Sequence, residues 1–100
     1  MFEIRLEEPA MGMAAGSLMD RVNALVRQLI EKAEQLLKDN LPPWETVEAG
    51  VTAAYDRFIR PLSIPNFIDN IILKGVLTQV KKIYDELAES GVPVYTEPQQ

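Results

Sequence analysis

The sequence predicts an all-α protein, a three-helix bundle with extended N- and C-terminal arms. Two observations predict this fold: three stretches repeat apolar residues every three or four positions, and prolines separate these stretches. Such a repeat is typical of helices that bury one face. We expect long helices at residues 17–39 and 65–90 and a shorter helix at residues 43–60.

Three segments follow from this pattern. Residues 1–16 form an N-terminal arm and linker, residues 17–91 form the helical domain, and residues 92–100 form a C-terminal tail. One hundred residues are enough for a single domain that buries a core without metals or disulfides. The hydrophobic share of 47% fits an ordinary globular protein, so this core needs no unusual explanation.

The first helix has the clearest apolar stripe. Its members are Leu18, Val22, Leu25, Leu29 and Leu36, widened by Val26, Ile30, Ala33 and Leu37. Ser17 can cap this helix, and Asp20 complements the positive end of the helix dipole. Pro42 and Pro43 then end the helix near Asn40.

The second helix begins beside Pro43, where a missing N–H does no harm. Its predicted buried face consists of Trp44, Val47, Val51, Ala54, Tyr55 and Phe58. Gly50 lies inside this helix and costs about 1 kcal/mol relative to alanine. We interpret Gly50 as the point of a close approach between helices. Pro61 ends the segment.

The third helix follows a short link that contains Pro61 and Pro65. Its first half is apolar on nearly all sides, and Gly91 followed by an apolar residue and a proline is a strong C-terminal stop. Asp69 and Asn70 interrupt the apolar half. Either one of them points into a core or interface, or both are exposed at the helix N-terminus.

The two arms have a weaker pattern. Residues 1–8 alternate apolar and charged side chains, as a half-buried strand does, and residues 92–96 have strand-forming residues around Pro93. A single strand is not stable alone. Either the two arms pair with each other, within or between chains, or both are loosely ordered.

Composition excludes most catalytic and metal-binding chemistry. The chain has neither histidine nor cysteine, which removes the commonest general base, the commonest nucleophile pairs and the commonest metal ligands. The carboxylate pairs Glu31–Glu34 and Glu45–Glu48 fall on polar helix sides. We therefore expect no catalytic residue, no metal, no cofactor and no enzymatic activity.

Charge and hydropathy exclude two further classes of partner. The net charge is −5 and no segment is basic, so we expect no nucleic-acid binding and no membrane binding. The most apolar run, residues 64–77, is interrupted by polar residues and is too short to span a bilayer. The N-terminus lacks the basic and apolar regions of a signal peptide. We expect a soluble cytoplasmic protein.

The remaining functions involve binding. We expect a structural or protein-interaction domain that self-associates through apolar helix faces, as a homodimer, or that binds an unknown protein partner. The candidate interface residues are Phe67, Ile68, Ile71, Ile72 and Val76. The alternative is a small-molecule-binding module with an aromatic pocket formed by Trp44, Tyr55, Phe58 and Tyr84.

Overall fold

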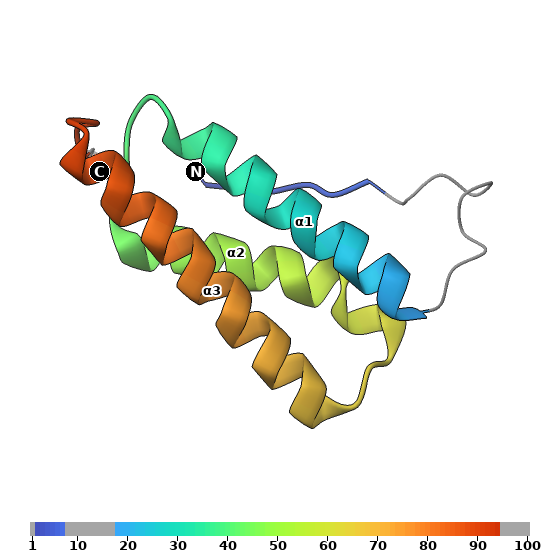
Figure 1. Ribbon diagram of the computed structural model, residues 1–100. Coiled ribbons are helices and arrows are strands. Elements are labelled where there is room, and N and C mark those ends of the chain that lie inside the picture. Colours follow the sequence, from blue (N-terminus) through green and yellow to red (C-terminus); the bar gives the residue numbers. More distant parts are fainter. Residues whose placement is uncertain (1, 8–17, 95–100) are drawn as a thin grey trace, which may run out of the picture.

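The computed structural model describes residues 2–7 and 18–94, and this part of the chain contains three α-helices (Figure 1). They are α1 (Leu18–Leu37), α2 (Trp44–Phe58) and α3 (Asn66–Glu89), with a 3-10 turn, η2 (Arg60–Leu62), between the last two. The predicted all-α three-helix bundle is confirmed, and each predicted helix end lies within two residues of the observed end. Ser17, the linker residues 8–16 and the tail residues 95–100 lie outside the described residues.

Helices α1 and α2 run antiparallel, while α3 runs alongside α1 in nearly the same direction and crosses α2 (Figure 1). The apolar stripe of each helix supplies one side of the common core. The buried apolar residues of the bundle are Val22, Leu25, Leu29, Ala33 and Leu37 of α1, Val47, Val51, Ala54 and Tyr55 of α2, and Val76, Val80 and Tyr84 of α3, joined by Leu41, Ile59 and Ile64 from the links. Leu18 and Leu36, expected in the α1 stripe, are exposed, and Leu36 lies beside Ile4 of the N-terminal arm.

Short links hold the helices in place. Ser63, with a φ of 63°, turns the chain left-handed between η2 and α3. At the end of α3, Gly91 has a φ of 104°, and the Val92 N–H donates a hydrogen bond of 3.0 Å to the Leu87 carbonyl. This is the predicted glycine stop, and it turns the chain back toward the link between α1 and α2.

The start of the C-terminal tail pairs with that link. The Leu41 N–H donates a hydrogen bond of 2.8 Å to the Pro93 carbonyl, and Leu41 and Val94 form an isolated parallel bridge. The described residues of the two arms therefore do not pair with each other within one chain, and pairing between chains stays a prediction. The link between α1 and α2, and not the N-terminal arm, is the segment that pairs with the start of the C-terminal tail.

The N-terminal arm, residues 2–7, is extended and lies between α1 and α2. Ile4 and Leu6 are only 4% and 7% exposed, whereas their charged neighbours Glu3, Arg5 and Glu7 are exposed, so the alternating pattern does mark a half-buried segment. The side chain of Gln28 takes the role of a neighbouring strand. The Glu7 N–H donates to Gln28 Oε1 at 2.9 Å, and Gln28 Nε2 donates to the Glu7 carbonyl at 2.7 Å.

Gly50 marks the close approach of this arm and not, as predicted, of another helix. A Cβ atom on Gly50 would lie 2.5 Å from Cδ1 and 2.8 Å from the carbonyl oxygen of Phe2. Atoms at such distances overlap, and a backbone oxygen cannot rotate away as a side chain can. The second helical glycine, Gly75, has nothing within 4 Å of the equivalent position.

These two glycines give opposite predictions for the same substitution. In dilute solution, Gly75→Ala raises the free energy of unfolding by about 0.5–1 kcal/mol, because alanine is the better helix former and meets no obstacle. Gly50→Ala lowers it by about 1–3 kcal/mol, because the new methyl group collides with Phe2. Urea unfolding followed by circular dichroism measures both. Equal stabilisation by the two substitutions would show that Phe2 does not pack on Gly50.

Candidate functional site

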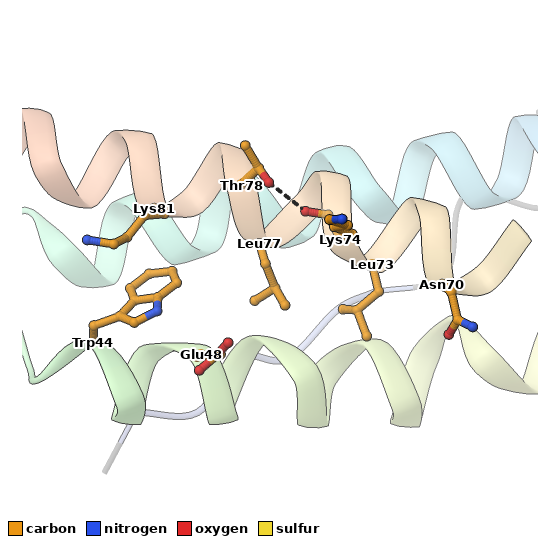
Figure 2. Close-up of a pocket in the computed structure, with 8 residues that line it drawn as sticks. All are labelled: Trp44, Glu48, Asn70, Leu73, Lys74, Leu77, Thr78 and Lys81. Atoms are coloured by element: carbon orange, nitrogen blue, oxygen red, sulfur yellow. Dashed lines mark hydrogen bonds between the residues drawn. The ribbon is translucent and has the colours of Figure 1, made fainter. Parts of the chain in front are cut away.

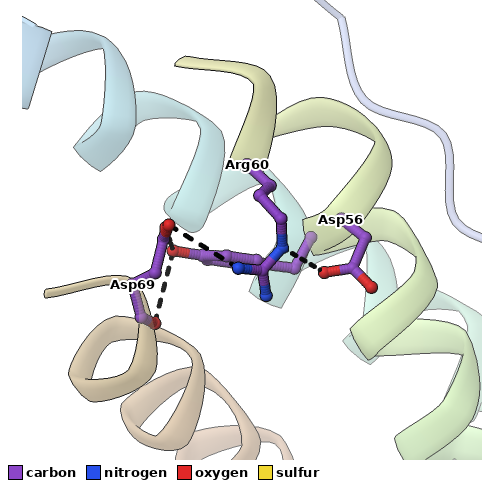
Figure 3. A network of polar contacts seen from close by, with 4 residues as sticks. Asp56, Arg60 and Asp69 are labelled. Atoms are coloured by element: carbon purple, nitrogen blue, oxygen red, sulfur yellow. Dashed lines mark hydrogen bonds and ion pairs between the residues drawn. The ribbon is translucent and has the colours of Figure 1, made fainter. Parts of the chain in front are cut away.

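The first turns of α3 are anchored by a buried carboxylate. Asp69 is 1% exposed, and the Tyr55 hydroxyl donates a hydrogen bond to its Oδ1 atom. Arg60 Nη1 lies 3.7 Å from Oδ2 of Asp69, while Arg60 Nε donates a hydrogen bond of 2.7 Å to Asp56 (Figure 3). Of the two alternatives for Asp69 and Asn70, the inward-pointing one is therefore confirmed, with Asp69 as the buried residue.

The same contacts keep Tyr55 in its protonated form. Burial raises the pKa of the Tyr55 hydroxyl well above its ordinary value of 10.0, and the hydrogen bond to Asp69 and its negative charge raise this pKa further. The positive charge of Arg60, whose guanidinium lies 5.6 Å from the centre of the Tyr55 ring, partly opposes the rise. Tyr55 thus remains a hydrogen-bond donor to a carboxylate that would be costly to bury without partners.

This anchor sets the rotation of α3 about its own axis. Residues two positions away on a helix point about 200° apart, so the neighbours at that spacing face away from Asp69. Phe67 and Ile71 are these neighbours, and each is 68% exposed. We call this pair the α3 ridge. It places two large apolar side chains in water on successive turns.

A groove borders the α3 ridge between α1 and α3 and has a volume of about 390 Å³. We call it the α1–α3 groove. Its walls are Val26, Arg27, Ile30 and Glu31 of α1, and Ile71, Ile72, Gly75, Val76 and Gln79 of α3. Val26, Ile30, Ile72 and Val76 are buried or partly buried in this groove, whereas Ile71 is exposed, and Arg27 and Glu31 are the charged residues of its α1 side. Because Gly75 has no side chain, the α3 wall is lowered at its middle.

The candidate interface residues separate into three environments. Phe67 and Ile71 are exposed, Ile68 and Ile72 are partly buried against the core, and Val76 belongs to the core. The structure therefore brings the first four together around the α3 ridge. Val76 supports this surface from below and also lines the α1–α3 groove.

A second groove, of about 470 Å³, lies between α2 and α3 (Figure 2). We call it the α2–α3 groove. It is lined by Trp44 and Glu48 of α2, and by Asn70, Leu73, Lys74, Leu77, Thr78 and Lys81 of α3. The Trp44 ring meets the ring of Tyr84 edge-on at 5.5 Å, and the Tyr84 hydroxyl donates a hydrogen bond of 2.6 Å to the Pro42 carbonyl. Lys81 Nζ lies 5.4 Å from the centre of the Trp44 ring.

The four residues of the candidate aromatic pocket are not brought together around this groove. Trp44 lines it and Tyr84 packs behind Trp44, whereas Tyr55 is fully buried beside Asp69. Phe58 is partly buried with the Arg57 guanidinium 5.3 Å from its ring centre. The apolar spacing of α3 does not predict its leucines as groove residues, because the same spacing also fits a core.

Comparisons with protein-family models, with curated proteins and with solved structures give no match. Among residues 2–7 and 18–94, no three acidic side chains gather closely enough to hold a metal ion. Within the same ranges, no helix combines the length and hydropathy required to cross a bilayer. The function must therefore be argued from the exposed surfaces described above.

The buried tyrosine predicts how stability depends on alkaline pH. Its raised pKa means that the stabilisation by Tyr55 is fully present below pH 10 and is lost as the pH rises toward the pKa of the folded state. Tyr55→Phe removes this loss of stability at alkaline pH. At neutral pH the same substitution lowers the free energy of unfolding by about 1–3 kcal/mol, because Asp69 loses a hydrogen-bond donor. Urea unfolding at pH 7 and above pH 10 measures both effects.

Tyr84→Phe serves as the comparison for this measurement. Burial also raises the pKa of Tyr84, but its hydroxyl donates to a backbone carbonyl and not to a carboxylate. We expect it to change the alkaline slope less than Tyr55→Phe does. If wild type and Tyr55→Phe lose stability equally above pH 10, the proposed role of the Tyr55–Asp69 contact is wrong.

Proposed function

We propose that this chain is a non-enzymatic helical interaction domain that self-associates as a homodimer through the α3 ridge and the α1–α3 groove. The exposure of Phe67 and Ile71 beside an apolar groove carries the proposal. Contiguous apolar surface that a monomer leaves in water marks interaction sites in other proteins. Burying one such side chain contributes about 1.5–3 kcal/mol, so two of them are a substantial driving force.

A second copy is the occupant that suits this surface. In a two-fold symmetric dimer each copy must present both halves of the contact, since every residue pair occurs twice. Here the α3 ridge and the α1–α3 groove share Ile71 and lie side by side. The ridge of one copy can therefore enter the groove of the other while its own groove receives the second ridge.

The charges on the α1 wall support the same pairing. Arg27 precedes Glu31 by four residues, which is the less favourable order for an ion pair within one helix. No ion pair between these two side chains occurs in the described part of the chain. Around a two-fold axis, Arg27 of each copy can meet Glu31 of the other, which forms two ion pairs at the edge of the apolar contact.

A second candidate function is the binding of a small amphiphilic anion in the α2–α3 groove. Its volume of about 470 Å³ falls in the range of roughly 300–1,000 Å³ common for ligand sites. Leu73 and Leu77 offer an apolar floor, and Lys74 and Lys81 stand beside it. The groove is open along one side, and Lys81 already pairs with Asp85 at 2.9 Å. These two features make it the weaker candidate.

Ile71→Lys tests the dimer. Its side chain is exposed, so the substitution leaves the helical content unchanged and places an unpaired charge in the contact. We expect the association constant to fall at least tenfold, which corresponds to about 1.4 kcal/mol. Sedimentation equilibrium over a range of protein concentrations measures it. Val94→Lys is the matched control, because Val94 is also exposed and apolar but lies beyond the other end of α3.

Charge reversal tests the two-fold pairing itself. Arg27→Glu alone and Glu31→Arg alone should each weaken association by placing like charges opposite each other, and an equimolar mixture of the two variants should associate again as a heterodimer. A wild-type chain that remains monomeric at every concentration measured would remove the proposal. Equal weakening by Ile71→Lys and Val94→Lys would place the contact elsewhere.

The anion site has its own test through Trp44, the single tryptophan of the chain. Titration with dodecanoate should shift Trp44 emission to shorter wavelength as the apolar tail covers the ring. Lys81→Glu should abolish this shift. Lys82→Glu should not, because Lys82 is exposed and does not line the groove. No spectral change in wild type at millimolar dodecanoate would remove this candidate.

A further inference from the structure

We propose that the cleft between α1 and α2 is a recognition site for an extended segment, filled here by residues 2–7 of the same chain. We further propose that it accepts the same segment from a second copy. We call it the arm cleft. Its contacts involve neither the α3 ridge nor the α1–α3 groove.

The arm is bound as a short linear ligand would be. Its apolar side chains at alternate positions enter the cleft, with Ile4 and Leu6 buried and Phe2 partly buried against the core. Its backbone is held at one end by both polar atoms of the Gln28 side-chain amide. All these contacts come from six consecutive residues, so the segment needs no other part of its chain to be recognised.

Gly50 shapes the cleft for a main chain and not only for side chains. The Phe2 carbonyl oxygen would lie 2.8 Å from a Cβ atom at this position, so only glycine admits the backbone here. A glycine in the middle of a helix is unfavourable unless something requires it. The Phe2 end of the segment is thus recognised by shape, and the Glu7 end by hydrogen bonds.

Charges on the rims match those of the segment. Lys32 of α1 and Arg57 of α2 line the two sides of the cleft, each beside Glu3 of the arm. The described residues contain no ion pair that engages Lys32 or Arg57 within the bundle. Glu3 also lies 3.9 Å from Arg5 of the arm, and a segment with a carboxylate at the Glu3 position is therefore favoured over one with a cation there.

A second copy is the source of such a segment, because every copy carries one ahead of α1. Ten residues, 8–17, connect the arm to α1. The bound end of the arm at Gln28 lies ten residues along α1 from Leu18, a distance of about 15 Å. The eleven steps from residue 7 to residue 18 can span up to about 36 Å, so the connection also allows exchange between copies.

Binding in trans is tested with a fluorescein-labelled peptide of residues 1–8 and the full-length chain. The chain carries Ile71→Lys throughout, so that failure of the α3 contact cannot affect the result. Adding Leu6→Asp displaces the chain's own arm, and we expect the peptide to bind this variant at least tenfold more tightly than the chain with an intact arm. Fluorescence anisotropy measures the affinity.

Two matched variants locate the binding. Adding Gly50→Ala to the Leu6→Asp chain should abolish peptide binding, whereas adding Gly75→Ala should leave it unchanged. If Leu6→Asp fails to fold, Phe2→Asp replaces it, because Phe2 is only partly buried. A folded variant that binds no peptide, or equal binding to the two alanine variants, would overturn the recognition site.

Exchange between copies is tested by shortening the connection. Removing residues 8–16 leaves two steps, which span at most about 7 Å and cannot cover the distance of about 15 Å to the chain's own cleft. In the Ile71→Lys background this deletion should convert a monomer into a dimer by sedimentation equilibrium, and adding Gly50→Ala should return it to a monomer. A monomer before Gly50→Ala is added would overturn the exchange while leaving recognition of the peptide in trans intact.

Discussion

The buried carboxylate of Asp69 is the constraint on which the candidate surface depends. A charge removed from water costs several kcal/mol unless partners replace the lost hydration. Tyr55 and Arg60 supply these partners from α2 and from the turn after it, so α3 has one favourable rotation. At that rotation Val76, about two turns further on, faces the core as Asp69 does. The same contacts of Asp69 leave Phe67 and Ile71 facing the solvent.

The other two helices leave α1 uncovered on two sides, and these sides differ in what covers them. On one side the extended arm covers the core and Gly50 makes room for its backbone. On the other side Gly75 lowers the wall of a groove that nothing in the described chain fills. One glycine thus makes room for the bound arm, and the other lowers the wall of an unfilled groove. This contrast is why the α1–α3 groove, and not the arm cleft, is the primary candidate for a contact with another molecule.

Local patterns were sufficient to predict the helices but not their surroundings. Apolar spacing and prolines act within a few residues, which is why the predicted helix ends lie close to the observed ones. The environment of Asp69 depends on Tyr55, fourteen residues away, and that of Gly50 depends on Phe2 at the far end of the chain. A helical repeat relates residues three or four positions apart, so it cannot predict contacts between residues that are far apart in the sequence. The unusual residue could be recognised in each case, a carboxylate in an apolar run and a glycine within a helix, but its partner could not.

Electrostatics gives a further reason to favour these contact surfaces. A net charge of −5 on each copy opposes association at long range. At physiological ionic strength, however, charges more than about 8 Å apart are largely screened, so the side chains at the contact decide the balance. The α1–α3 groove carries one positive and one negative residue, and the arm cleft presents Lys32 and Arg57 to an acidic segment. Each surface is thus locally neutral or attractive within an acidic molecule. That local balance is what self-association of such a chain requires, because apolar burial alone would have to overcome like charges at close range.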